Sequence, residues 1–168
     1  IWEVDKEGLY VYSSPVVEKI LGYKPEEIVG KKHYYDFFLP ETREVYRKAI
    51  ESLFEQKKTI RNMINVNVHK NGRKVILETS GVPFLDSSGN FIGYRGVDKD
   101  ITEREQAQQA LRHSEEKFFK AFHYSPDPFF ISRLKDGTFL EINEGFTRVY
   151  GGSREDIIGR SSLSLIHI

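Results

Sequence analysis

The sequence predicts an α+β fold in which a five-stranded antiparallel sheet carries helices on one face. The order of the elements is the first reason, because two short strands, several helices and then three strands follow one another along residues 1–99. The change of hydrophobic period is the second, since apolar and polar residues alternate from Thr59 onward as they do in a strand. Asn71-Gly72, a typical hairpin turn, separates the first two strands of the resulting three-stranded meander.

The N-terminal residues predict a hairpin followed by helices. Residues 1–5 and 9–12 are strand-forming segments on either side of a turn. Ser14 is expected to cap the next helix, with Pro15 at its first position and Gly22 at its end. Further helical segments follow at residues 24–28, 33–39 and 40–57.

The longest of these helices and the meander complete the predicted domain. Apolar residues recur at helical spacing along the helix and define its expected buried face: Val45, Ala49, Ile50, Leu53 and Phe54. The three strands of the meander are expected at residues 59–69, 73–84 and 91–99.

The stretch from Gly93 to Glu105 joins the last strand to another helix. Thr102 and Glu105 have the spacing of a capping box, in which each side chain bonds to the other residue's amide. The predicted helix covers residues 102–124, and residues at the spacing of a coiled-coil seam recur in it: Ala107, Leu111, Ser114, Phe118 and Ala121. An amphipathic helix that packs on its own domain is the alternative interpretation.

The sequence repeats itself at one constant offset. Lys6-Glu7-Gly8 returns as Lys135-Asp136-Gly137, and Gly22 returns 129 residues later as Gly151. The segment 26–31 returns at 155–160 with the same offset, so the repeat indicates a tandem duplication of one domain. The second copy reaches Ile168, before its own long helix and meander, and we therefore expect it to be incomplete.

Composition excludes several classes of function. The 25 basic and 25 acidic residues balance, which argues against broad binding to nucleic acid. The absence of cysteine rules out disulfides, thiolate metal sites and cysteine nucleophiles. No apolar run has the length of a membrane span and no signal peptide is evident, so a cytoplasmic location without direct membrane contact is expected. The first residue is Ile1, which leads us to expect a piece of a longer protein with a possible anchor upstream.

These features resemble the PAS family with its C-terminal PAC motif. The resemblance rests on Gly22-Tyr23, on Asn71-Gly72 and above all on Asp100-Ile101-Thr102, and in the second copy on Ser125-Pro126-Asp127 and Asn143. It implies a PAS domain with PAC motif at residues 1–101, a linker helix at 102–124 and the N-terminal part of a second PAS domain at 125–168.

The resemblance also implies a sensory role. Family members usually lie upstream of a histidine kinase or a diguanylate cyclase, and they transmit a change in their pocket through the helix that follows Asp-Ile-Thr. A histidine kinase is the expected output, and a cofactor-binding redox or gas sensor or a ligand-free dimerisation module of a diguanylate cyclase are the alternatives. PAS domains bind haem, flavins, small acids, metals or nothing, so the family alone assigns no ligand.

Tests for intrinsic chemistry give negative results. The chain has no nucleophile–base–orienter arrangement, no phosphate-binding glycine loop and no metal-ligand cluster. His69 lies near a hairpin tip, and His113 and His123 are ten residues apart on the linker helix, which does not bring them together. We therefore expect no catalytic residue, no metal and no enzyme activity in this part of the protein.

Haem and flavin are examined through the family resemblance. The best-known haem-binding members use a histidine on the long helix, whereas residues 41–57 contain none and His33 is the only nearby candidate. Light-sensing members use a cysteine that this chain lacks, and of their three amide positions only Asn67 is matched, while Leu77 and Asp98 differ. The cofactor stays unassigned, with no cofactor as the expectation and flavin or haem as alternatives.

The strand that begins at Thr59 allows two opposite orientations. Hydrophobic patterning would bury Ile60, Ile64, Val66 and Val68, whereas the family register turns Asn67 inward, and with it Asn65, Met63 and Arg61. In the family register, which we prefer, the pocket could hold a small polar ligand or ordered water, and polar residues line it: Asn65, Asn67, Thr79, Tyr94 and Asp98. A collapsed pocket is the alternative.

The outer face of the sheet would then expose Ile and Val side chains. We expect this face and the helical seam to hold a parallel homodimer. The route from the pocket to an output domain in the same protein is expected to pass through Asp100, Ile101, Thr102 and Glu105.

Overall fold

The computed structural model describes residues 1–162. These residues form two compact units that divide after Gln106, and each unit is described by itself. Across residues 1–162, no helix has the length and hydropathy needed to cross a membrane.

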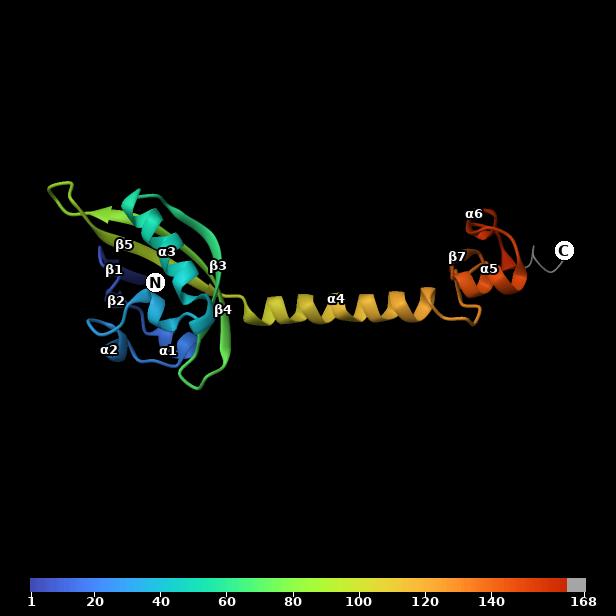
Figure 1. Cartoon of the computed structure of the whole chain (residues 1–168), viewed down its shortest axis with the longest axis horizontal. Coiled ribbons are helices and arrows are strands. Elements are labelled where there is room, and N and C mark those ends of the chain that lie inside the picture. Colours follow the sequence, from blue (N-terminus) through green and yellow to red (C-terminus); the bar gives the residue numbers. More distant parts are fainter. Residues whose placement is uncertain (163–168) are drawn as a thin grey trace. The chain divides into compact units, whose positions relative to one another are not determined.

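The first unit contains a five-stranded antiparallel sheet, as predicted (Figure 1). The strands lie in the order β2-β1-β5-β4-β3 and have these bounds: β1 Trp2–Asp5, β2 Tyr10–Ser13, β3 Ile60–Val68, β4 Lys74–Leu85 and β5 Phe91–Asp100. The first strand of the chain thus pairs with the last strand of the sheet, and Trp2 lies opposite Gly96. This pairing joins the N-terminal hairpin and the three-stranded meander into one sheet.

Helices cover one face of this sheet. They are α1 Val16–Leu21, α2 Pro25–Ile28, the 3-10 helix η1 Tyr34–Phe37 and α3 Pro40–Glu55. Gly22 ends α1 at φ +78°, a left-handed conformation that glycine adopts without strain. Ser14 does not cap α1, because Pro15 itself takes the N-cap position and no side chain caps the helix.

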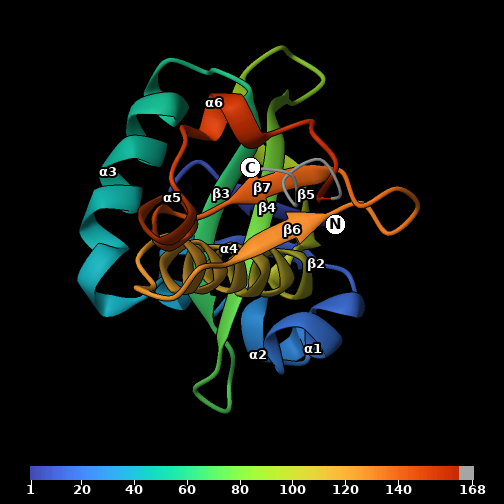
Figure 2. The same ribbon diagram turned by 90° about the vertical axis from the view of Figure 1, so that its right-hand side faces the viewer.

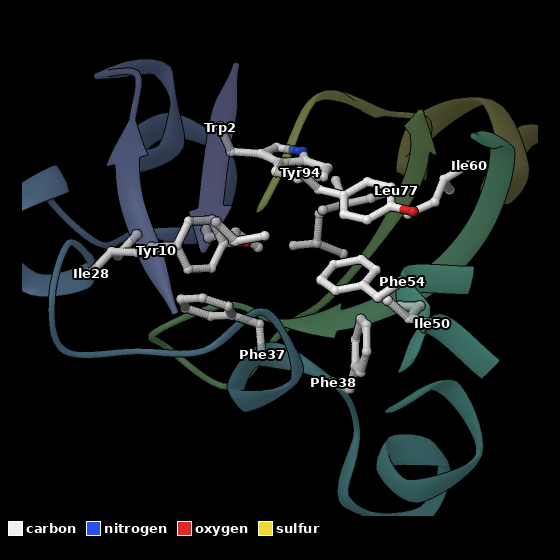
Figure 3. Close-up of a cluster of buried hydrophobic side chains, with 13 residues drawn as sticks. Trp2, Tyr10, Ile28, Phe37, Phe38, Ile50, Phe54, Ile60, Leu77 and Tyr94 are labelled. Atoms are coloured by element: carbon white, nitrogen blue, oxygen red, sulfur yellow. The ribbon is translucent and has the colours of Figure 1, made fainter. Parts of the chain in front are cut away.

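The core lies between the sheet and these helices, and Figure 3 shows rings from both layers meeting there. Phe54 of α3 stacks on Tyr94 of β5 with ring centroids 4.0 Å apart. The Tyr94 hydroxyl lies 2.9 Å from the Leu53 carbonyl oxygen and 2.8 Å from that of Lys58, so it fastens the end of α3 to the sheet. A stacked aromatic pair of this kind adds about 0.5–1.5 kcal/mol beyond the burial of its surface.

The buried face of α3 differs from the predicted one. Ile50 and Phe54 are buried as expected, but Val45 is 70% exposed and Ala49 is also exposed. Tyr46 takes the place expected for Val45, because its ring packs against Phe38 with centroids 5.3 Å apart. The aromatic contacts of Tyr46 and Phe54 therefore decide which face of α3 is turned toward the core.

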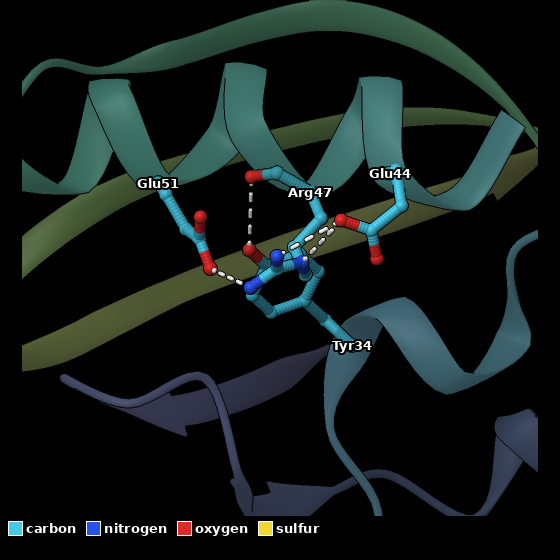
Figure 4. A network of polar contacts seen from close by, with 4 residues as sticks. All are labelled: Tyr34, Glu44, Arg47 and Glu51. Atoms are coloured by element: carbon cyan, nitrogen blue, oxygen red, sulfur yellow. Dashed lines mark hydrogen bonds and ion pairs between the residues drawn. The ribbon is translucent and has the colours of Figure 1, made fainter.

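The outward side of α3 carries an ion-pair network (Figure 4). The Arg47 guanidinium bonds to Glu44 at 2.9 Å and to Glu51 at 2.8 Å, while the Arg47 carbonyl accepts a long bond from the Tyr34 hydroxyl. Exposed pairs of this type contribute only about 0–1 kcal/mol each. The buried face, rather than this network, holds α3 on the sheet.

A β-bulge in β3 corrects part of the predicted orientation. Asn65 and Asn67 face the core, whereas Ile64 is 52% exposed, as the family register requires. Between Ile60 and Met63 the pairing with β4 shifts by one residue, and Asn62 takes φ +47° there. The prediction was therefore wrong for Ile60, which is buried, and for Arg61, which is exposed.

Helix α4, Thr102–His123, follows β5 directly and leads into the second unit. Of its predicted seam, Leu111 and Phe118 are 60% and 58% exposed, so the described residues do not cover this face.

The second unit repeats the first elements of the first unit. It contains β6 Phe130–Ser132, β7 Phe139–Ile142, α5 Glu144–Tyr150 and α6 Arg154–Ile157, which Figure 2 shows beside one another. Both ends of β7 and of α6 lie 129 residues after those of β2 and α2, in agreement with the repeat in the sequence. Residues 163–168 of the predicted second copy lie outside the described residues.

Candidate functional site

A small cavity lies between the inner face of the sheet and the helices of the first unit. Its volume is about 40 Å³, and its walls are mostly apolar and aromatic, with Trp2, Tyr10, Tyr34, Phe38 and Phe54 among them. A cavity needs only about 10–15 Å³ of this kind of space to hold a water molecule. The cavity therefore has room for water or for a very small ligand.

The sheet supplies polar groups to this cavity from three neighbouring strands. Asn65 and Asn67 come from β3, Thr79 from β4 and Asp98 from β5, and all four line the cavity. Thr79 pairs with Asp98 across β4 and β5, so the antiparallel register itself brings these two side chains together.

These four side chains form one continuous chain of hydrogen bonds. Asn67 Nδ2 donates to Asn65 Oδ1 at 2.6 Å, and Asn65 Nδ2 donates to Thr79 Oγ1 at 2.8 Å. The Thr79 hydroxyl then donates to Asp98 Oδ1, also at 2.8 Å. Every donor points toward Asp98, and bonds aligned in one direction polarise one another. The Asp98 carboxyl is the acceptor end of the chain.

The environment of Asp98 works against its ionised form. Burial is the main cause and raises the pKa of its carboxyl above the ordinary value, while the donors Thr79 and Trp2 and the amino group of Ile1 lower the pKa in part. No Lys, Arg or His forms an ion pair with Asp98 in residues 1–162. The Trp2 indole N–H is buried and makes no hydrogen bond of ordinary geometry in the described part of the chain, so it acts on the carboxyl only at longer range.

Tyr10 is the other titratable group beside this carboxyl. Burial raises the pKa of its hydroxyl, and the nearby Asp98 and Asp36 carboxylates raise it further. Tyr10 therefore stays neutral and adds no positive or negative charge to the cavity at ordinary pH.

A second cavity of about 250 Å³ lies along α1 and the start of the chain. Asp98, Trp2 and Tyr10 line both cavities. The second cavity also reaches Ile1 and Val16, which are 64% and 57% exposed. Asp98 thus lies where the inner cavity meets a larger one that extends toward the surface.

One of the five residues predicted to line the pocket does not do so. Tyr94 is fully buried behind the cavity, where its ring stacks on Phe54 and its hydroxyl fastens α3. The prediction missed Trp2, whose indole lies against Gly81 and Gly96. Its position as the single tryptophan in a predicted strand was the available signal. The pairing of β1 with β5, which places Trp2 opposite Gly96, is not visible in the sequence.

The hydrogen bonds at the start of α4 are not those of the predicted capping box. Thr102 Oγ1 accepts the amide of Ile76 at 2.9 Å and donates to Asp100, while Asp100 Oδ1 accepts the Thr102 amide. The Glu105 amide bonds to the Ile101 carbonyl, so the capping box was wrong. Thr102 Oγ1 instead serves β4, because the partly buried Ile76 amide would otherwise lose its acceptor.

The β4–β5 pairing connects this helix start to the cavity. Leu77, which lines the cavity, lies opposite Asp100, and the Ile101 amide bonds to the Ile76 carbonyl at 3.0 Å. Residues 76–79 of β4 therefore touch the cavity at one end and the first residues of α4 at the other.

The histidines do not assemble into a site. His33, the candidate haem ligand, stacks on Tyr35 with centroids 4.9 Å apart and does not line the cavity. Within residues 1–162 there is no group of three or more histidine, aspartate and glutamate side chains that could hold a metal ion.

Comparison with known proteins assigns the fold to a family. Residues 10–98 match the family model described as "PAS fold". The chain belongs to the PAS family. A second model, described as "PAS domain", matches residues 126–167, which supports the repeat of PAS sequence in the second unit.

One curated protein is similar over part of this chain. The aryl hydrocarbon receptor nuclear translocator homolog of Drosophila melanogaster is 30% identical over 88 residues, which make up 52% of this chain but only 14% of that protein.

Two solved structures share the PAS fold. The N-terminal domain of a diguanylate cyclase with PAS/PAC sensor from Marinobacter aquaeolei has a TM-score of 0.55 at 18% identity and covers 62% of this chain and 95% of that one. A sensory box histidine kinase/response regulator from Burkholderia thailandensis has a TM-score of 0.54 at 23% identity, covering 71% and 88%.

Proposed function

We propose that residues 1–101 are a sensory PAS domain that binds a small polar ligand in the cavity beside Asp98. The observation that carries the proposal is the chain of hydrogen bonds from Asn67 to Asp98 in a cavity that is otherwise apolar. A buried polar network is unfavourable unless every member is satisfied. Its last member, Asp98, has one carboxylate oxygen bonded to Thr79 and forms no ion pair with a side chain of residues 1–162. A ligand or ordered water at this end would complete the network.

The second part of the proposal is a route from the cavity to α4. Ligand binding beside Asp98 changes the Thr79–Asp98 contact between β4 and β5. The same two strands hold Asp100 and Thr102 through Leu77 and Ile76, so a shift in their pairing alters the start of α4. Glu105 belongs to this route only as part of the first turn of the helix.

The downstream partner is proposed by analogy with the structural relatives. A histidine kinase is our first choice and a diguanylate cyclase the second, because these are the proteins from which similar PAS structures come. In this account residues 102–124 form the linker helix, 125–168 belong to a second PAS domain, and the output lies in the same protein.

A homodimer is the proposed oligomeric state. The sheet face opposite the helices carries exposed Ile64, Val82 and Val97, each about half exposed, which supports a contact with a second copy. The exposed Leu111 and Phe118 of α4 support a parallel helix pair as its continuation.

A cofactor-binding sensor is the second candidate function. Pockets for drug-sized ligands occupy roughly 300–1,000 Å³, whereas this cavity measures about 40 Å³. A flavin or haem would require the aromatic walls to move apart, so we favour the small ligand.

Native mass spectrometry with a visible absorption spectrum tests the proposal directly. We expect either a bound small molecule or a rise in melting temperature with at least one compound of a metabolite panel, and we expect Asn65→Leu to abolish that rise. Glu78→Gln, on the neighbouring position of β4, is the control and should leave the rise unchanged. If no molecule is bound and no compound raises the melting temperature, the sensory function of this domain is refuted.

A further inference from the structure

The direction of the hydrogen-bond chain defines the charge that the cavity offers. Thr79 Oγ1 receives the Asn65 amide and must use its only hydrogen toward Asp98 Oδ1. Asp98 Oδ1 is therefore an acceptor. When the carboxyl is ionised, this hydrogen-bond chain ends in a negative group at the cavity, and the Trp2 indole N–H is a buried donor beside it that makes no hydrogen bond of ordinary geometry in the described residues.

The positive charge that would balance this carboxylate is not supplied by a side chain. Among the described residues, the linings of the two cavities contain no Lys, Arg or His side chain. A buried carboxylate without a partner is unfavourable, and a cation that enters the cavity relieves this cost.

The walls favour an organic cation over a metal ion. Aromatic rings from Trp2, Tyr10 and Phe54 surround the space, and the faces of such rings attract cations. A metal ion would need several charged or strongly coordinating ligands, and within residues 1–162 no group of three or more His, Asp and Glu side chains could hold one.

The volume of the cavities and the access to Asp98 restrict the class of ligand further. The inner cavity of about 40 Å³ admits only a few heavy atoms, and the second cavity of about 250 Å³ gives a path to Asp98 from the side of α1. A primary ammonium group can donate to the free oxygen of Asp98 while a short alkyl chain contacts the rings.

We infer that the ligand of this cavity is a small primary alkylammonium ion held by the Asp98 carboxylate and the surrounding aromatic rings. The inference rests on the proposed sensory function and specifies its ligand class.

Trp2 provides a direct readout of the cavity. It is the single tryptophan of the chain and lines both cavities, so its fluorescence reports on their occupancy. The 168-residue chain is titrated with ethylammonium chloride against potassium chloride at equal ionic strength, and ethanol and sodium acetate serve as the neutral and anionic probes. An acetylated N-terminus removes the charge of Ile1 and isolates the effect of Asp98.

We expect a saturable change in Trp2 fluorescence with ethylammonium only, with a dissociation constant on the order of 1 mM for so small a ligand. A matching rise of about 5 °C in melting temperature is expected at twenty times that concentration. Asp98→Asn should weaken binding at least about tenfold, the loss expected for a hydrogen bond to a charged group. Glu78→Gln removes the same charge from the opposite face of β4 and should leave binding unchanged.

The outcomes separate the two proposals. Equal binding by Asp98→Asn, or no saturable response to ethylammonium, overturns the ammonium class. If ethanol, acetate or a compound of the metabolite panel binds instead and changes Trp2 fluorescence, the sensory function stands while the ammonium class fails. If no probe and no panel compound binds, both proposals fail.

Discussion

Thr79 on β4 donates a hydrogen bond to Asp98 on β5, with 2.8 Å between Thr79 Oγ1 and Asp98 Oδ1. This contact lies inside the cavity, and it also joins the two strands that lead to α4. The proposed ligand site and the proposed signal route therefore share one pair of side chains.

Removal of the Thr79 hydroxyl should destabilise the first unit. Thr79→Val keeps the shape of the side chain but removes the Thr79 donor to Asp98 and one of the two acceptors of Asn65 Nδ2, the other being the Met63 carbonyl at 3.1 Å. We expect a loss of about 1–3 kcal/mol in the free energy of unfolding, measured by urea denaturation. Thr79→Ser keeps the hydroxyl, and a loss as large as that of Thr79→Val would show that the hydrogen bonds do not matter.

Replacement of the Asp98 carboxyl should stabilise the protein at neutral pH in the absence of ligand. The pKa of Asp98 is raised in the folded protein above its ordinary value of 3.8, so stability is complete below that pH and falls as the pH rises through the folded-state pKa. The Asp98→Asn variant has no carboxyl to ionise at this position, so its stability should not fall with rising pH for this reason.

The melting temperatures of the two proteins should thus be closest below about pH 4 and diverge as the pH rises, with the variant higher. Glu78→Gln is the matched control and should follow the wild-type profile. A difference between Asp98→Asn and the wild type that does not vary with pH would contradict the burial of an ionised carboxyl.

Thr102 should matter for the junction of β4 and α4 through Ile76. Thr102→Ala removes the acceptor of the Ile76 amide, and we expect that amide to exchange its hydrogen faster and the unit to lose about 1–2 kcal/mol. Glu105→Ala tests the alternative, because in a capping box it would be equally damaging. We expect less than about 0.5 kcal/mol from this second variant, and Trp2 fluorescence should respond to ligand as before in both.

The close approach of Trp2 to two glycines gives a graded test of the cavity wall. An added Cβ at Gly96 would lie 2.4 Å from both Trp2 Cζ2 and the Ser80 carbonyl oxygen, whereas at Gly81 it would lie 3.0 Å from Trp2 Cη2. Gly96→Ala should therefore displace the indole and shift the Trp2 emission strongly to the red, and Gly81→Ala should do so weakly. The reverse order would contradict the position of Trp2.

The exposed sheet face should control association. A single charge at Val82 or Val97, each on the face opposite the helices, should convert a dimer to a monomer in light scattering, since a buried unpaired charge is costly in an interface. Val45→Lys, on the exposed side of α3, is the control and should leave the mass unchanged. A wild-type chain that is already monomeric at all concentrations refutes the proposed dimer.

The order and patterning of the segments were sufficient to predict the five-stranded sheet. The inward orientation of Asn65 and Asn67 came from the family register, because hydrophobic alternation alone predicted the opposite face. The sequence was insufficient where distant segments meet. The bulge at Asn62 reverses the orientation of Ile60, and no local pattern marks it. Thr102 has the spacing of a capping residue, but its hydroxyl accepts the hydrogen bond of the Ile76 amide. Trp2 lines the cavity only because β1 pairs with β5, and the bulge lies in the pairing of β3 with β4.

Hydrogen exchange with and without a bound ligand tests the central claim most directly. The amides to follow are those of Ile76, Ile101 and Glu105, which bond to Thr102, Ile76 and Ile101 respectively. Our account predicts that a ligand that changes Trp2 fluorescence also changes exchange at these three amides, and that Thr79→Val uncouples the two effects. A ligand that fills the cavity while exchange at all three amides stays the same would contradict the route from Asp98 to α4.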